Sequence, residues 1–212
     1  MIYTLDEIKN DLRELTSKQF YIKHIIRSDN WYLQNYLGKN PDEVIRLLDD
    51  YRLIISENMG VSMNSIMMVG SGKIGYSLSP PDSIHPENTK LFEPFNDDEL
   101  VRKVSDLDIA IISNDIFQKY WGLFRKSFRM KYITTYSHVY QELYRGYINE
   151  RNIMEVDGCR VEWNKTASIS KKRIHDELYF IHDISFRIYR SWEDFEDYNI
   201  QNIEKLKKRI ES

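Results

Sequence analysis

The sequence contains one cysteine, Cys159, among its 212 residues. A single cysteine excludes an intramolecular disulfide and fits a reducing compartment. No apolar run approaches the roughly 18 residues that a membrane-spanning helix requires, and the N-terminal residues do not follow a signal-peptide pattern. We therefore expect a soluble, cytoplasmic protein without a membrane partner.

An excess of positive charge is also lacking. The formal net charge is −3, although 30% of the residues are charged. This balance excludes a global basic field that would attract nucleic acid, but it does not exclude a local basic groove. The chain has no internal repeat or low-complexity tract. We predict one domain over residues 1–212, with an N-terminal helical segment (1–39), a core (40–190) and a C-terminal helix (191–212).

The middle of the chain contains two apolar runs that predict buried strands. The first, Ile66–Val69, leads into the glycine-rich segment Gly70–Ser77, and the second lies within Ser105–Ile112. Glycine allows a chain to leave the edge of a sheet sharply. Side chains two apart on a strand share one face, so Asp106 and Asp108 are expected to project side by side.

Two adjacent carboxylates repel each other, and a cation between them favours the ionised form of both. Oxygen ligands suit Mg²⁺ or Mn²⁺, which proteins usually hold with one or two carboxylates together with substrate phosphates. The glycine-rich segment supplies the complementary half, because backbone N–H groups at Gly70 and the hydroxyls of Ser71 and Ser77 can bind phosphate oxygens. The combination predicts a metal-dependent phosphoryl- or nucleotidyl-transfer site, with Asp106 and Asp108 as catalytic metal ligands.

Two other phosphate-binding motifs fit this segment less well. Its three glycines match the dinucleotide fingerprint G-x-G-x-x-G, but that motif needs a long helix after the third glycine, and Pro80 and Pro81 follow too soon. Gly72-Lys73 is similar to the end of a P-loop, but Ile74 stands where that loop has serine or threonine. Lys73 could contact a β- or γ-phosphate of a nucleotide, or it could be an exposed loop lysine.

Gly70-Ser71, Gly75, Ser77 and Ser105-Asp106-Leu107-Asp108-Ile109 together resemble the signature of the DNA polymerase β-like nucleotidyltransferase superfamily. That signature comprises a hydrophobic strand, Gly-Ser, a short helix, and a strand bearing Asp-x-Asp between apolar residues. The resemblance covers about the middle quarter of the chain. The family usually places the two halves close together, whereas residues 79–104 intervene here. We interpret them as an inserted loop, which could be a lid, an acceptor-binding element or a solvated excursion.

The resemblance implies an α+β fold, in which helices flank a small mixed sheet of the nucleotidyltransferase type and a helical element ends the chain. It also implies Mg²⁺-dependent transfer of a nucleoside monophosphate from a triphosphate such as ATP to a hydroxyl acceptor. Compact members include oligonucleotide-signal synthases in antiviral defence, antitoxins that modify toxins, and enzymes that modify RNA ends or small molecules. We favour the building of an oligonucleotide. The alternatives are modification of a protein or RNA, and a catalytically silent nucleotide-binding partner of a toxin or effector protein.

The family generally adds a third carboxylate on a neighbouring strand. Glu162 is one candidate metal ligand, because it lies between two apolar residues in a short strand predicted at Cys159–Trp163, beside the turn Asp157-Gly158. Asp183 competes with it, because it precedes a strand predicted at Ile184–Tyr189. A site with only two carboxylates is the third possibility.

Helix signals flank this core. Thr4 and Asn40-Pro41 are typical of helix starts, and Gly60 is typical of a helix end. Asp115 is expected to cap a further helix, and Ser191–Ile210 predicts an amphipathic helix. A basic cluster interleaved with aromatic residues follows Asp115 (Arg125, Lys126, Arg129 and Lys131). It suits contacts to nucleic-acid phosphates, but a solvated face with snorkelling side chains is the alternative.

Overall fold

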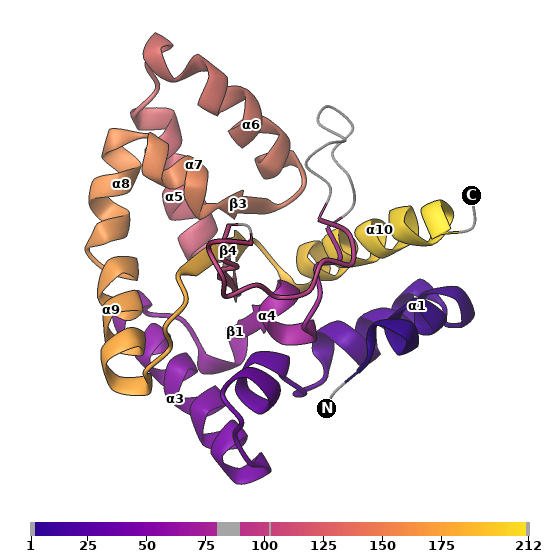
Figure 1. Cartoon of the computed structure of the whole chain (residues 1–212). Coiled ribbons are helices and arrows are strands. Elements are labelled where there is room, and N and C mark those ends of the chain that lie inside the picture. Colours follow the sequence, from indigo (N-terminus) through magenta and orange to yellow (C-terminus); the bar gives the residue numbers. More distant parts are fainter. Residues whose placement is uncertain (1–2, 80–89, 102, 211–212) are drawn as a thin grey trace. The chain divides into compact units, whose positions relative to one another are not determined.

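The computed structural model describes residues 3–79, 90–101 and 103–210 (Figure 1). Helices flank a small mixed sheet of four strands in the order β1-β2-β4-β3. The strands are β1 (Ile66–Val69), β2 (Leu107–Ile112), β3 (Tyr147–Asn149) and β4 (Ile184–Tyr189). β3 and β4 pair antiparallel, with Ile148 opposite Ile188. The predicted α+β class with a small mixed sheet is confirmed.

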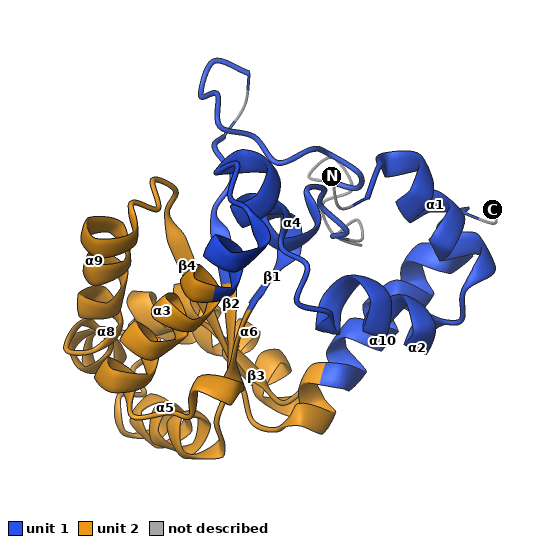
Figure 2. Ribbon diagram, turned by 90° about the horizontal axis from the view of Figure 1, so that it is seen from below, with its two compact units in different colours: residues 1–45, 68–108, 196–212 blue, residues 46–67, 109–195 orange. Residues whose placement is uncertain are grey.

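The structure divides into two compact units, which Figure 2 shows in different colours. Unit 1 comprises residues 1–45, 68–108 and 196–212, and unit 2 comprises residues 46–67 and 109–195. The glycine-rich segment and both aspartates of the Asp-x-Asp motif belong to unit 1. Glu162 and Asp183 belong to unit 2. The single domain that we expect from the sequence stays a prediction.

Unit 1 begins with two short helices, and each of them starts with a capping box. Thr4 accepts a hydrogen bond from the N–H of Glu7 at the start of α1 (Leu5–Glu14), and Thr16 does the same with Gln19 at the start of α2 (Ser17–Phe20). Leu15 between them has an extended backbone. The N-terminal helical segment that we predict over residues 1–39 is therefore interrupted at Leu15. Two π-helical segments follow, Tyr21–Ile26 and Tyr32–Tyr36.

The long helix α3 (Pro41–Met59) has the bounds that its end signals predict. Asn40 and Glu43 cap each other, because the side chain of each accepts a hydrogen bond of 3.0 Å from the backbone N–H of the other. The helix ends before Gly60, whose φ of +68° is a backbone conformation that glycine adopts readily. A 3₁₀ turn (Met63–Ser65) then leads into β1.

Unit 2 contains most of the remaining helices: α5 (Asn114–Lys126), α6 (Ile133–Tyr144), α7 (Glu150–Glu155), α8 (Asp157–Asn164) and α9 (Ala167–Leu178). The expected cap at Asp115 is wrong by two residues. Ser113 caps α5 instead, because its hydroxyl accepts a hydrogen bond from the N–H of Ile116. A 3₁₀ turn (Met130–Tyr132) joins α5 to α6. The C-terminal helix α10 (Trp192–Ile210) is confirmed.

The strand that we predict at Cys159–Trp163 is wrong, since these residues form most of α8. The error has a physical origin in the spacing of the apolar residues. Val156, Cys159 and Trp163 are at most 1% exposed, and they recur three and four residues apart, which is the helical period. Val161 is 57% exposed and does not belong to the buried face. Glu162 therefore projects from a helix and not from a strand.

None of the described helices combines the length and the apolar character that crossing a membrane would demand.

Candidate functional site

The glycine-rich segment turns sharply out of β1 into the short helix α4 (Gly70–Ile74). Gly70 has a φ of +67°, and Gly75 ends the helix with a φ of +91°. Both values lie in the left-handed region, which favours glycine over residues with a Cβ atom. The N–H of Gly75 donates a hydrogen bond of 2.8 Å to the carbonyl of Ser71. The short helix that the family signature implies after Gly-Ser is therefore present.

The Asp-x-Asp motif meets this turn at Gly70. Asp108 lies on β2 and is half-buried. A Cβ atom placed on Gly70 would lie 2.5 Å from Oδ2 of Asp108 and 3.3 Å from its Cγ atom. The separation of 2.5 Å is too short for a real Cβ atom, so the carboxylate of Asp108 occupies space that a glycine leaves open. The two halves of the motif, 38 residues apart in the chain, are in van der Waals contact.

Asp106 directly precedes β2, and its side chain is exposed. Leu107 and Ile109 are at most 1% exposed, as expected for the opposite face of this segment. The Asp106 carboxylate makes no hydrogen bond or ion pair with the described residues. The arrangement therefore leaves one carboxylate open to solvent and a second one against the glycine turn.

The chain that follows α4 pairs with the far end of the inserted loop. The N–H of Phe95 donates to the carbonyl of Gly75, the N–H of Ser77 donates to the carbonyl of Glu93, and the N–H of Phe92 donates to the carbonyl of Ser77, each over 2.8 Å. Residues 90–95 are thereby fixed beside the glycine turn. The described part of the loop is therefore attached to the segment after α4, and residues 80–89 lie outside the described residues. Its role as a lid, an acceptor-binding element or a solvated excursion stays a prediction.

Asn96 then connects the inserted loop to the Asp-x-Asp motif. The N–H of Ser105 donates to the carbonyl of Asn96 over 2.8 Å, and the hydroxyl of Ser105 accepts from the N–H of Asn96 over 3.0 Å. The side-chain amide of Asn96 donates to the carbonyls of Asp98 and Lys103. Asn96 is 8% exposed. A continuous set of hydrogen bonds therefore runs from Gly75 to the residue that precedes Asp106.

Sequence reasoning missed this role of Asn96 and Ser105. The available signal was their residue type, because asparagine and serine at the two ends of a loop form local hydrogen bonds with the backbone. The family resemblance draws attention to residues that bind metal and phosphate, and it says nothing about the residues that fix an insertion.

Lys73 is buried, with 6% of its surface exposed. Its ammonium group donates a hydrogen bond to the backbone carbonyl of Arg27. The interpretation of Lys73 as an exposed loop lysine is therefore wrong. In this conformation its charged end is directed to the main chain after the first π-helical segment, and it anchors α4 there.

Aromatic rings pack near Gly75, the residue that ends α4. A Cβ atom on Gly75 would lie 2.6 Å from Cδ1 of Trp31. The ring of Phe95 lies 5.5 Å from that of Trp31, and Tyr36 stacks on Tyr32 at 5.1 Å. Partial burial raises the pKa of Tyr36, and the neighbouring Asp97 carboxylate raises it further. These rings support the backbone of the turn from within unit 1.

The serines and the candidate third carboxylates have different local environments. Ser71 and Ser77 are half-buried, and the hydroxyl of Ser77 accepts a hydrogen bond of 3.3 Å from the N–H of Ser79. Glu162 forms ion pairs with Lys165 and, over 3.6 Å, with Lys119. The hydrogen bond from Lys165 holds the pKa of Glu162 below its usual value.

Asp183 is exposed and directly precedes β4, which is the strand that we predict there. Within the described ranges, no group of three or more histidine, cysteine, aspartate or glutamate side chains is arranged to hold a metal ion. The Asp-x-Asp motif offers the carboxylates of Asp106 and Asp108, to which a bound phosphate group could add further oxygen ligands.

Comparison with models of protein families, with curated proteins and with solved structures finds no significant match.

Proposed function

We propose that this protein is a nucleotidyltransferase of the DNA polymerase β-like type, which moves a nucleoside monophosphate from a nucleoside triphosphate to a hydroxyl acceptor. One observation carries the proposal. The carboxylate of Asp108 lies against Gly70, so an acidic metal-binding element and a turn suited to phosphate are adjacent within unit 1.

The residues at the turn fit a hard divalent cation. Asp106 and Asp108 offer only oxygen ligands, which is the donor type that Mg²⁺ and Mn²⁺ prefer, and triphosphate oxygens commonly complete such sites. When bound, Mg²⁺ or Mn²⁺ supplies positive charge that neutralises the triphosphate and assists ionisation of the acceptor hydroxyl. Asp106 and Asp108 hold the cation in this proposal.

The proposed reaction is a displacement at the α-phosphorus of the nucleotide. A bond forms between the acceptor oxygen and the α-phosphorus, and the bond from the α-phosphorus to the oxygen that bridges it to the β-phosphorus breaks. The acceptor proton passes to a carboxylate or to water, and pyrophosphate leaves. Positioning and charge neutralisation account for most of the rate in such reactions.

In this proposal, three features of the chain position the triphosphate and the catalytic aspartates. The backbone N–H groups of the turn at Gly70 and the hydroxyls of Ser71 and Ser77 donate to phosphate oxygens. The hydrogen bonds from Gly75 through Asn96 to Ser105 set the distance between that turn and Asp106. Lys73 acts indirectly, because its bond to the carbonyl of Arg27 fixes the helix that follows Gly70.

This proposal assigns no third carboxylate. Glu162 lies on a helix and pairs with Lys165, whereas Asp183 is exposed and precedes a strand. Both residues belong to unit 2, and the proposed site consists of the two carboxylates of unit 1. Glu162 and Asp183 as metal ligands stay predictions from the sequence.

The direct test incubates the protein with each α-labelled ribo- and deoxyribonucleoside triphosphate and Mg²⁺, and then resolves the products by size. A ladder of products indicates that an oligonucleotide is built, a labelled protein band indicates protein modification, and label on added RNA indicates modification of RNA. Replacement of Asp106 or Asp108 by asparagine is expected to lower transfer at least about 100-fold, because each removes a charged ligand at the reacting phosphates.

Ser168→Ala, an exposed change on α9, provides a control with unaltered transfer. Nucleotide binding without any transfer would favour a catalytically silent partner and would contradict the enzymatic proposal. Equal transfer by the wild type and by both asparagine variants would contradict the assigned site.

A further inference from the structure

Positive charge is concentrated in residues 116–149 of unit 2, which contain most of α5, all of α6 and β3. This segment has six lysine or arginine residues and one carboxylate, whereas the whole chain carries a net charge of −3. The carboxylate is Glu142, which is 7% exposed and accepts hydrogen bonds from the backbone and side chain of Asn149. The solvent-facing part of this segment therefore carries cations without acids of its own.

Three of these cations lie together at the C-terminal end of α5 and just beyond it. Arg125, Lys126 and Arg129 are exposed and form no ion pair with a described acid. Arg125 lies 5.8 Å from the centre of the Trp121 ring. The other three cations of the segment have different surroundings: Lys119 pairs with Glu162, Lys131 pairs with Asp157, and Arg145 lies 5.4 Å from the centre of the Tyr147 ring.

Exposed aromatic rings accompany the three cations. Tyr140 and Tyr144 lie one turn apart on α6 and are 72% and 85% exposed. Trp121 and Phe128 are 39% and 46% exposed. Tyr136 joins the two helices, because its hydroxyl donates to the carbonyl of Phe124 over 2.6 Å and its ring meets Phe128 edge-on at 4.9 Å. These contacts join the first half of α6 to α5, and Tyr140 and Tyr144 follow Tyr136 at one-turn intervals along α6.

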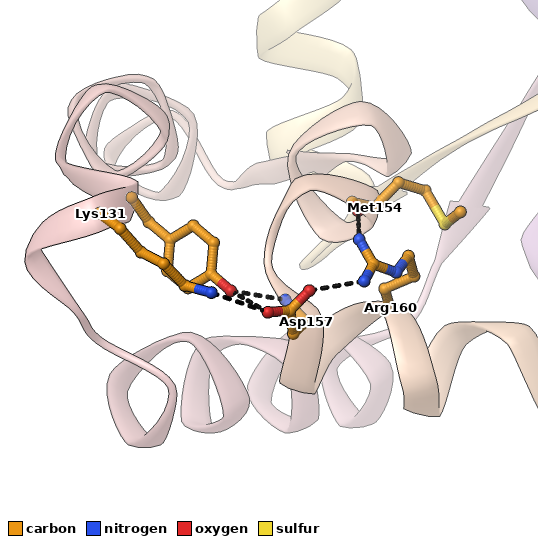
Figure 3. A network of polar contacts seen from close by, with 5 residues as sticks. Lys131, Met154, Asp157 and Arg160 are labelled. Carbon is orange, nitrogen blue, oxygen red and sulfur yellow. Dashed lines mark hydrogen bonds and ion pairs between the residues drawn. The ribbon is translucent and has the colours of Figure 1, made fainter.

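Asp157 fixes the turn between α5 and α6 (Figure 3). Its carboxylate accepts hydrogen bonds from Lys131, at 3.0 Å, and from the hydroxyl of Tyr132, and it pairs on its other side with Arg160. Arg160 in turn donates to the carbonyl of Met154. The turn that leads from the cations to the tyrosines of α6 is thus tied to α8, which lowers the entropic cost of binding a ligand there.

We propose that this region, the α5–α6 surface (Trp121, Arg125, Lys126, Arg129, Tyr140 and Tyr144), binds a single-stranded nucleic acid. The cations would contact phosphates, and the tyrosine rings would stack on unpaired bases. Ser137, His138 and Gln141 are also exposed on α6, so its exposed part mixes polar and aromatic residues with the aliphatic Ile133. Such a mixed face fits bases and phosphates better than the acyl chains of a membrane, which need a continuous apolar face. The proposal concerns binding by unit 2 and does not depend on the proposed transfer.

The test measures fluorescence anisotropy of labelled single-stranded RNA and single-stranded DNA of about 20 nucleotides with the full chain, without nucleotide or Mg²⁺. The wild type is expected to bind at least one of the two strands. Replacing Arg125, Lys126 and Arg129 together by glutamine is expected to weaken binding and to flatten the slope of log affinity against log salt by about 2, from roughly 0.7 per lost phosphate contact. Tyr140→Ala with Tyr144→Ala is expected to weaken binding at least about 30-fold and to leave that slope unchanged.

Matched controls remove the same charge or the same kind of side chain elsewhere. Glutamine at the exposed Lys172, Lys205 and Lys208 changes the net charge equally, and Tyr179→Asn removes a tyrosine that is 77% exposed. Both controls, and Asp106→Asn with Asp108→Asn, are expected to bind the strands as the wild type does. Circular dichroism verifies that each variant is folded.

Absence of strand binding at low salt would overturn the proposal. Equal effects of the α5–α6 variants and their controls would do so as well, because they would indicate non-specific attraction. Co-sedimentation with phosphatidylserine vesicles in the absence of strand binding would assign the surface to membranes instead. If strand binding succeeds while transfer fails, the proposed function falls and this inference stands.

Discussion

At the scale of single residues, Gly70 links backbone conformation to the proposed chemistry. Its φ of +67° and the approach of Asp108 Oδ2 both exclude a side chain. Gly70→Ala is expected to cost about 1–2 kcal/mol of stability from backbone strain. It is also expected to displace the Asp108 carboxylate and to lower transfer about 100-fold, since small displacements at a reacting centre can have effects of this size.

Gly38→Ala separates the two effects of Gly70→Ala. Gly38 also lies in unit 1 and has a φ of +63°, but a Cβ atom there would meet nothing within 4 Å. Thermal unfolding should therefore show a similar loss of stability in both variants, whereas the transfer assay should show a defect only in Gly70→Ala. Similar transfer by the two variants would mean that the contact with Asp108 has no functional role.

Lys73 provides a second test at this scale, between an anchoring role and a phosphate-binding role. Lys73→Met keeps the length of the side chain but leaves the carbonyl of Arg27 without this donor. We expect a loss of about 1–3 kcal/mol in the free energy of unfolding. Chemical denaturation measures that loss, and calorimetry measures the affinity for triphosphate. Unchanged stability with a large loss of triphosphate affinity would favour direct phosphate binding.

Gly70, Asp106 and Asp108 could be identified from the sequence because their spacing and residue types are specific to the motif. The burial of Lys73 could not be identified in the same way. Its hydrogen-bond partner, the carbonyl of Arg27, is 46 residues away in the chain, and a backbone carbonyl leaves no trace in the residue type.

At the scale of elements, the paired segments 75–77 and 92–95 make the inserted loop part of the site. Asn96→Ala removes the amide that donates to the carbonyls of Asp98 and Lys103. Because two hydrogen bonds are then lost, at about 0.5–1.5 kcal/mol each, we expect a loss of about 1–3 kcal/mol in the free energy of unfolding and faster amide exchange at Ser105. Transfer should fall as well, since Ser105 precedes Asp106.

Asn35→Ala, at an exposed position of unit 1, is the matched control and should alter neither amide exchange nor transfer. Hydrogen exchange read by mass spectrometry distinguishes a local effect from global unfolding. Uniformly faster exchange across unit 1 in Asn96→Ala would mean that Asn96 supports the fold and not the position of Asp106.

The hydrogen bonds and ion pairs around Asp157 make the stability of the fold depend on pH. Hydrogen bonds from Tyr132 and Lys131 hold the pKa of Asp157 at about 2, against an ordinary value of 3.8. Because the folded-state pKa is lowered, the ionised carboxylate stabilises the fold fully above the ordinary value, and this contribution disappears as the pH falls toward 2. We therefore expect Asp157→Asn to unfold at a lower temperature than the wild type near neutral pH.

That difference in the unfolding midpoint should shrink between pH 4 and pH 2. Thermal unfolding followed by circular dichroism at several pH values measures it. A difference that stays constant down to pH 2 would show that Asp157 does not stabilise the turn through its charge. Asp176→Asn, at an exposed acid on α9, is the control and should show no such convergence.

A helix or strand could be predicted where the sequence pattern fits only one type of structure. It could not be predicted where a short pattern fits both a helix and a strand. α3 has a capping asparagine, a first-turn proline and a terminal glycine, and β4 alternates apolar and polar residues along its length. α8 has a short apolar-acid-apolar sequence at Val161–Trp163 that also fits a strand. The segment forms a helix, because a helix buries both Cys159 and Trp163 on one face.

At the scale of the whole molecule, the α+β class follows from the family resemblance, which implies helices around a small mixed sheet. The division into two units does not follow, because its boundaries pass through the continuous elements α3, β1, β2 and α10. No change in composition marks those boundaries. All groups that the proposal assigns to the triphosphate and its cation lie in unit 1, and the α5–α6 surface lies in unit 2.

The most direct measurement for the central claim is a calorimetric titration with a non-hydrolysable nucleoside triphosphate, with and without Mg²⁺. If the Asp106–Asp108 pair and the turn at Gly70 hold one metal–triphosphate complex, the wild type binds the nucleotide only with Mg²⁺, and Asp106→Asn with Asp108→Asn abolishes that binding. Binding that is equally tight without Mg²⁺, or in the double variant, would contradict the account.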